Sequence, residues 1–214
     1  MVKEAIFMKK FFESFVLSAK EFTKLRCLCI TAIFIAASML LEMMSINLQF
    51  VKINFAFLAI AVIGMLFGPT VGFFAGLICD VVGFIASPMG GFLPLYTLVA
   101  GLQGLIYGCC LYIRNDSHSL LLKNNTTGKL IDVTLFVKAT IARLLDVIVI
   151  NLLINTKLNL HYGFIPKEAY GAAIIARISQ NVIELVGYLP LLYIVLPAAY
   201  MAYKRLAVKG SSLA

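Results

Sequence analysis

The sequence predicts an all-α membrane protein with six transmembrane helices and both termini in the cytoplasm. Of its 214 residues, 62% are hydrophobic and 13% are charged, and that charged fraction is about half of what soluble domains carry. The apolar residues form several runs near the length that a bilayer requires, about 20 residues. Nucleic-acid binding, which the net charge of +8 would otherwise suggest, is disfavoured because the positive charges lie in the tails and one loop.

The N-terminal segment, residues 1–24, mixes aromatic and aliphatic residues with five lysines. Such a basic amphipathic pattern is typical of a helix that lies on the membrane surface, and a disordered tail is the alternative. The next apolar run is too long for the core of a signal peptide, so we expect it to remain as a transmembrane helix. We therefore divide the chain into this segment, a transmembrane domain over residues 25–206 and a cytoplasmic tail over residues 207–214.

Six apolar runs are expected to span the membrane. The second is short, and Gly68-Pro69 turns it directly into the third. Residues 47–54 alternate polar and apolar side chains like a short strand, and residues 87–91 and 114–131 are expected to be loops. The six predicted spans are approximately residues 25–46, 55–67, 70–86, 93–113, 133–154 and 170–202.

The distribution of lysine and arginine predicts the orientation. With the N-terminus inside, twelve of these residues fall on the cytoplasmic side and three on the outside, namely Lys52, Lys157 and Lys167. Positive residues are enriched in cytoplasmic segments. This asymmetry predicts that both termini are cytoplasmic. We expect a multi-pass protein of the cell membrane of a bacterium.

No motif indicates catalysis or metal binding. A phosphate-binding GxxxxGK[ST] loop, HExxH and GxSxG are all absent. The five cysteines lie in or beside apolar runs, and none forms a CxxC pair. We therefore interpret them as small apolar side chains that pack in the helices rather than as zinc ligands or disulfides. We therefore expect neither an enzyme nor a bound cofactor or metal.

Small residues recur at four-residue spacing in three of the spans. Such spacing lets helix backbones approach closely in lipid. We interpret the glycine series as internal packing, whereas the alanine pair of the first span has a further interpretation given below. The positions are Ala32 and Ala36, Gly68, Gly72 and Gly76, and Gly104 and Gly108.

Polar side chains inside the spans require an explanation, because a charge there costs ~2.5 kcal/mol or more on insertion scales. In the sixth span, Arg177, Asn181 and Glu184 are spaced i, i+4, i+7, which places them in one stripe about 60° wide. In the fifth span, Asn151 and Asn155 form an i, i+4 pair. With the predicted orientation, all five lie in the outer half of the bundle. They predict a polar chamber that opens to the outside.

Structural ion pairs are the alternative to a binding site. Arg177 could pair with Glu184, and Arg143 with Asp80 or Asp146. We favour a structural pair for Arg143 and Asp146, and a ligand pocket for the stripe on the sixth span because the asparagines converge on it.

Several short stretches of the sequence resemble a known family. Each stretch alone is a weak indication, but their order and spacing together are more specific. They resemble the substrate-binding (S) components of energy-coupling factor (ECF) vitamin transporters, and among these most closely the folate (FolT) family. Gln180 stands where members of that family usually have lysine. The stretches are residues 52–58, 64–72, 80–84, 88–94, 105–108, 151–156 and 177–181.

The resemblance implies a six-helix S component that captures a vitamin outside the cell. It would deliver the vitamin with a transmembrane coupling subunit and two cytoplasmic ATPases, and Ala32 and Ala36 would dock on the coupling subunit. The polar edge of a pterin can hydrogen-bond to amides and a carboxylate, and its flat ring fits a slot lined by aromatic side chains. The anionic tail of folate would bind a cation. Another vitamin, or a stand-alone secondary transporter or channel, is the alternative. The candidate substrate-binding residues are Lys52, Gly91, Phe92, Tyr96, Asn151, Asn155, His161, Tyr162, Arg177, Asn181 and Glu184.

Overall fold

The computed structural model describes residues 2–43, 46–47, 52–53, 55–86, 91–112 and 133–211. Most of these residues are helical, and the two-residue strands β1 (Ile46–Asn47) and β2 (Lys52–Ile53) pair antiparallel. In place of the single short strand expected over residues 47–54, the described residues there thus belong to two short strands that pair with each other. The loop expected at residues 114–131 lies outside the described residues, as does the loop expected at residues 87–91 except for Gly91.

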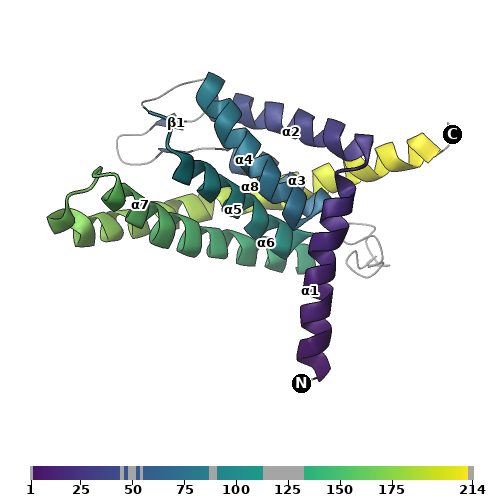
Figure 1. Cartoon of the computed structure of the whole chain (residues 1–214), viewed down its shortest axis with the longest axis horizontal. Coiled ribbons are helices and arrows are strands. Elements are labelled where there is room, and N and C mark those ends of the chain that lie inside the picture. The colour runs from purple at the N-terminus through teal and green to yellow at the C-terminus, as the bar shows by residue number, and fades with distance from the viewer. Residues whose placement is uncertain are drawn as a thin grey trace.

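The helices follow the predicted apolar runs closely. Within the described residues, four helices are long and apolar enough to cross a membrane: α2, α4, α5 and the segment that contains α8. In Figure 1 the helices after α1 run alongside one another, and α1 lies crosswise at one end. The bounds are α1 Val2–Glu21, α2 Leu25–Met43, α3 Phe57–Phe67, α4 Pro69–Ala86, α5 Pro94–Leu111, α6 Val133–Leu145, α7 Thr156–His161 and α8 Tyr170–Ser211.

The short helix α3 forms the centre of the bundle. All eleven of its residues are buried, although a surface helix would bury only one face. Its apolar side chains join a core completed by α5 and α8, among them Tyr107, Leu111, Leu192 and Leu196. A helix enclosed on all sides by other helices does not have to reach both faces of the bilayer by itself.

Glycines bring α4 and α5 into close contact. A Cβ atom added at Gly72 would lie 2.5 Å from the carbonyl oxygen of Gly104, and one added at Gly104 would lie 2.0 Å from the oxygen of Gly72. A Cβ at Gly76 would meet the oxygen of Ala100 at 2.2 Å, and one at Gly108 the Cα of Pro69 at 2.4 Å. The interpretation of these glycines as internal packing is confirmed.

The turn between α3 and α4 needs a glycine for its backbone. Gly68 has φ 91°, a left-handed conformation that residues with a Cβ rarely adopt. Pro69 follows as the first residue of α4, where its missing N–H costs no helical hydrogen bond. Two helices can therefore follow each other with one residue between them.

Candidate functional site

The predicted fifth span is a continuous run of three helical segments. After α6, a π-helix, η1 (Asp146–Asn155), leads without a break into α7. The π-helix is wider than an α-helix and is frequently found at functional sites. It carries both Asn151 and Asn155, so the polar residues predicted on this span sit on its least regular part.

Four of the predicted site residues form one hydrogen-bonded group, which we call the asparagine cluster: Asn151, Asn155, Arg177 and Asn181. The Nδ2 atom of Asn155 donates to Oδ1 of Asn151 over 3.3 Å, and Nδ2 of Asn151 donates to Oδ1 of Asn181 over 3.1 Å. Asn181 Nδ2 donates to the carbonyl oxygen of Arg177 over 2.8 Å, and Arg177 Nη1 donates to that of Asn151 over 3.2 Å. The cluster therefore joins η1 to α8.

The asparagine cluster retains hydrogen-bonding capacity. The buried Oδ1 of Asn155 accepts no hydrogen bond from the described residues. A buried acceptor without a partner costs about 1–3 kcal/mol, so it favours the binding of a group with an N–H or O–H donor. Arg177 is half-buried and supplies a permanent positive charge beside the amides.

Glu184, the third residue of the predicted stripe, turns toward a second group of charges. Its Oε1 accepts a hydrogen bond from Gln180 Nε2 at 2.9 Å, and its Oε2 lies 3.5 Å from Nη2 of Arg143. Arg143 also forms an ion pair with Asp146, with 2.6 Å between Nη1 and Oδ2. We call Arg143, Asp146 and Glu184 the buried charge cluster.

Aromatic and polar side chains enclose the buried charge cluster. The guanidinium of Arg143 lies 4.8 Å from the ring centres of both Phe57 and Tyr188, a favourable cation–π arrangement. Gln103 Nε2 donates to Asp146 Oδ2 over 3.1 Å. The side chains of Arg143 and Asp146 are 3% and 0% exposed. The predicted structural pair of Arg143 with Asp146 is therefore present in the fold, with Glu184 as an additional partner.

Asp80, the other partner considered for Arg143, lies in a different contact. Its Oδ2 accepts a hydrogen bond from Thr97 Oγ1 over 2.6 Å. That bond joins the last part of α4 to the first turn of α5. Of the two aspartates considered, Asp146 is therefore the one that pairs with Arg143.

Three predicted aromatic residues gather where α5 begins and α7 ends. The ring of Tyr96 stacks on Tyr162 with 5.9 Å between centroids and 23° between planes, and His161 meets Tyr162 edge-on at 5.4 Å. The hydroxyl of Tyr96 donates to Oδ1 of Asn159. Asn159 follows Asn155 by four residues, so the aromatic group adjoins the end of η1 that carries the asparagines.

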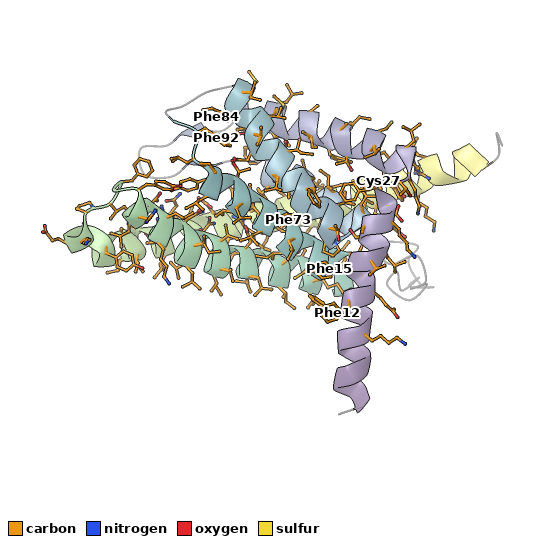
Figure 2. All side chains as sticks on the ribbon, in the orientation of Figure 1. Phe12, Phe15, Cys27, Phe73, Phe84 and Phe92 are labelled. Carbon is orange, nitrogen blue, oxygen red and sulfur yellow. The ribbon has the colours of Figure 1, made fainter. Side chains whose placement is uncertain are left out.

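The remaining predicted residues do not join these groups through the described contacts. Phe92 is 44% exposed and packs its ring against Phe84 with 5.2 Å between centroids, as Figure 2 shows near the end of α4. Gly91 is exposed, and an added Cβ would have no neighbour within 4 Å. Lys52 pairs with Asn47 through the backbone of β2, and its side chain lies outside the described part.

Sequence reasoning left two contact residues out of the candidate site. Asn159 follows Asn151 and Asn155 at the same four-residue spacing, so continuing that series along α7 would have found it. Tyr107 gave no such signal, because a tyrosine in an apolar run is ordinary. Its hydroxyl accepts from Arg143 Nη1 and donates to Asp146 Oδ2, both over 3.4 Å.

The side chains of these groups offer hydrogen-bonding atoms and a stacking surface for a small molecule. Amides and a guanidinium offer donors and acceptors at fixed positions, and stacked tyrosines offer a flat apolar face for a ring. Among the described residues, no group of three or more His, Cys, Asp or Glu side chains could hold a metal ion. The arrangement suits recognition of a flat, polar molecule with an anionic group.

An apolar bundle with helices long enough to cross a bilayer is the architecture of a membrane protein, and a polar cluster joins two of its helices. The chain belongs to the family described as "ECF-type riboflavin transporter, S component", which it matches over residues 23–197. This is a family of transporter components and not an enzyme family. The resemblance to ECF S components is thereby confirmed.

Two relatives concern folate. A "Folate transporter FolT" of Clostridium novyi (strain NT) is 35% identical over 74 residues, which cover 35% of this chain and 43% of that protein. The match thus spans less than half of the relative's length. A solved structure described as "Crystal structure of FolT bound with folic acid" is similar with a TM-score of 0.62 and 26% identity, over 78% of this chain and 92% of that one.

Proposed function

We propose that this protein is the S component of an ECF importer that captures folate or a reduced folate from outside the cell. The observation that carries the proposal is the likeness to the FolT structure with folic acid, which extends over 78% of the chain. The asparagine cluster supports it, because amides and an arginine match the chemistry of a pterin and its anionic tail.

Within this proposal, the asparagine cluster and the aromatic group bind different parts of the ligand. The free Oδ1 of Asn155 would accept a hydrogen bond from the pterin amino or amide group. Tyr96 and Tyr162, already stacked on each other, would contact the flat ring. Arg177 would bind a carboxylate of the tail, with Lys52 and Lys157 as further cations near the opening. Gly91, Phe92, His161, Asn181 and Glu184 complete the proposed set.

The proposed topology has six membrane spans with both termini in the cytoplasm of a bacterial cell. Two further helical stretches add to the four candidate spans. The continuous run of α6, η1 and α7 over residues 133–161 matches the fifth predicted span, and α3 matches the short second one. The twelve-to-three distribution of lysine and arginine supports the orientation. The polar groups then lie toward the outside, where the vitamin is captured.

The proposed partners are a transmembrane coupling subunit and two cytoplasmic ATPases. Ala32 and Ala36 are exposed on α2, so their small side chains are available to a partner helix. ATP hydrolysis would belong to the partner chains.

Ligand binding by the purified single chain tests the proposal. We expect saturable binding of folate or 5-formyltetrahydrofolate in detergent or nanodiscs without ATP, measured by calorimetry. Riboflavin is the second candidate, because the family that the chain matches is named for it. Thiamine and biotin serve as comparison ligands. Preferential binding of riboflavin would replace the folate assignment, and failure of all the vitamins would contradict the S-component proposal.

A further inference from the structure

The N-terminal helix α1 is fastened to the bundle by a buried serine. Ser18 Oγ donates to the carbonyl oxygen of Phe67 over 2.7 Å and accepts the backbone N–H groups of Thr70 at 3.0 Å and Val71 at 3.1 Å. It therefore satisfies the last turn of α3 and the first turn of α4, whose backbone groups lack helical partners. Thr70 Oγ1 also donates to the oxygen of Phe15 over 3.0 Å. These bonds fix the direction in which α1 leaves the bundle.

That direction carries the first half of α1 past the edge of the bundle. Figure 1 shows α1 crossing the end of the other helices, with the N-terminus well beyond them. Ser18 and Phe11 are seven residues apart, almost two helical turns, so they lie on nearly the same face. The face that meets the bundle at Ser18 is therefore the face that Phe11 presents beside the bundle, where lipid surrounds a membrane protein.

Phe11 and the exposed lysines of α1 lie on opposite sides of the helix. Phe11, Phe12 and Val16 are 40%, 62% and 57% exposed, and Figure 2 shows Phe12 and Phe15 on this helix. Lys9 and Lys20 are also exposed and lie about 160° and 180° around the helix from Phe11, at 100° per residue. Val16 lies beside these lysines, at about 140°, so the apolar face consists of the phenylalanines. An apolar face opposite lysines is typical of a helix that lies in the interface of a membrane.

The same end of the bundle is basic. The described side chains of α1, the turn after it, the first turn of α2 and the last part of α8 include six basic residues and two acidic ones. Basic residues close to a membrane surface attract anionic lipids, each by about 1 kcal/mol. They are Lys9, Lys20, Lys24, Arg26, Lys204 and Arg205, against Glu13 and Glu21.

We propose that α1 is an interfacial lipid anchor. Its phenylalanine face enters the headgroup region beside the bundle, and its lysines and their basic neighbours bind anionic phospholipid headgroups. Because Ser18 joins α1 rigidly to α3 and α4, the anchor fixes the depth and tilt of the whole bundle in the bilayer.

The absence of tryptophan from the chain allows a direct test. Phe11→Trp and Lys9→Trp each introduce a single fluorophore, two residues apart along α1 and on opposite faces. The full-length variants are reconstituted into phosphatidylcholine vesicles with and without phosphatidylglycerol, and quenching by brominated phosphatidylcholine and by aqueous acrylamide is measured. Phe15→Trp, about 120° around the helix from Lys9 and 40° from Phe11, replaces Phe11→Trp if that variant does not fold.

We expect brominated lipid to quench the fluorophore at position 11 about twofold more than the one at position 9, and acrylamide to show the reverse order. Phosphatidylglycerol should increase the lipid quenching at position 11, and Lys9→Gln with Lys20→Gln should remove that increase. Equal lipid quenching at the two positions would overturn the proposal, as would protection of position 11 from both quenchers, which indicates a protein contact. If lipid quenching at position 11 does not change when phosphatidylglycerol is added, α1 does not bind anionic lipid and that part of the proposal is overturned.

Discussion

Arg177 and Asn181 hold the asparagine cluster together, and both are proposed to contact the ligand. Asn181 bridges Asn151 and the backbone of Arg177, while the guanidinium of Arg177 is only half-buried. The guanidinium can therefore exchange its contact with a backbone carbonyl for one with a ligand carboxylate, a stronger charge-assisted bond.

We expect Arg177→Ala to weaken folate binding by about 10- to 100-fold, since a hydrogen bond to a charged group contributes ~1.5–3 kcal/mol. Asn181→Ala should have a similar or smaller effect. Titration calorimetry measures the change, and Ser179→Ala, an exposed position with a local bond to Ala176, is the matched control. Unchanged affinity in both variants would place the binding site elsewhere.

Arg143 is the residue on which the buried charge cluster depends. It lies between two carboxylates and two aromatic rings, and its side chain is 3% exposed. Removal of one member of a buried ion pair leaves an uncompensated charge, which costs more than the pair itself contributes.

We expect Arg143→Met to lower the stability of the bundle by about 3–5 kcal/mol. The double variant Arg143→Met, Asp146→Leu should recover part of that loss, because the fully buried carboxylate is then absent as well. Thermal unfolding in detergent, compared through a double-mutant cycle, measures the coupling. A single variant as stable as the parent protein would show that the pair contributes little.

At the scale of elements, the contact between α4 and α5 depends on the lack of side chains at facing glycines. The backbone oxygens of Gly72 and Gly104 occupy the space that a methyl group on the other residue would need. Since these oxygens belong to the backbone, they cannot move aside as a flexible side chain would.

We expect Gly104→Ala to separate α4 from α5 and to destabilise the protein by at least ~1–3 kcal/mol, the usual cost of overpacking. Gly187→Ala is the matched control: it lies within α8, is exposed, and a Cβ there meets nothing within 4 Å. That variant should be as stable as the parent or slightly more so, because alanine favours helix. Equal unfolding temperatures for the two variants would contradict the close contact.

At the scale of the whole molecule, the proposed ligand-binding site and the proposed docking surface for the coupling subunit lie on different helices. The asparagine cluster joins η1 to α8, whereas Ala32 and Ala36 lie exposed on α2. In this proposal, binding and docking use different helices, so each can be disrupted independently.

We expect Ala32→Trp combined with Ala36→Trp to abolish vitamin uptake in vesicles that contain the complete transporter, while binding by the isolated chain keeps its affinity. The bulky side chains would prevent a close helix contact with the coupling subunit. Radiolabelled uptake and calorimetry provide the two measurements, and Ile33→Trp, on another exposed part of α2, is the control. Loss of binding together with uptake would indicate that this face packs within the protein.

The amino-acid sequence by itself determined the class of protein, the approximate helices and the polar stripe. Helix bounds such as Leu25–Met43 and Pro69–Ala86 lie close to the predicted runs, because the length and hydrophobicity of a span are local properties of the chain. The convergence of Asn151 with Asn181 was expected because both residues lie at the same predicted depth and polar residues in spans face the bundle interior, and their side chains are hydrogen-bonded.

Only the tertiary structure decided which polar groups become partners. It paired Arg143 with Asp146 rather than Asp80, turned Glu184 toward Gln180 and Arg143, and set Ser18 on the ends of two distant helices. Each choice depends on which helices pack together and how they are rotated, and the π-helical turns of η1 alter that rotation. Periodicity along one helix specifies which residues share a face, but packing against the other helices specifies what that face meets.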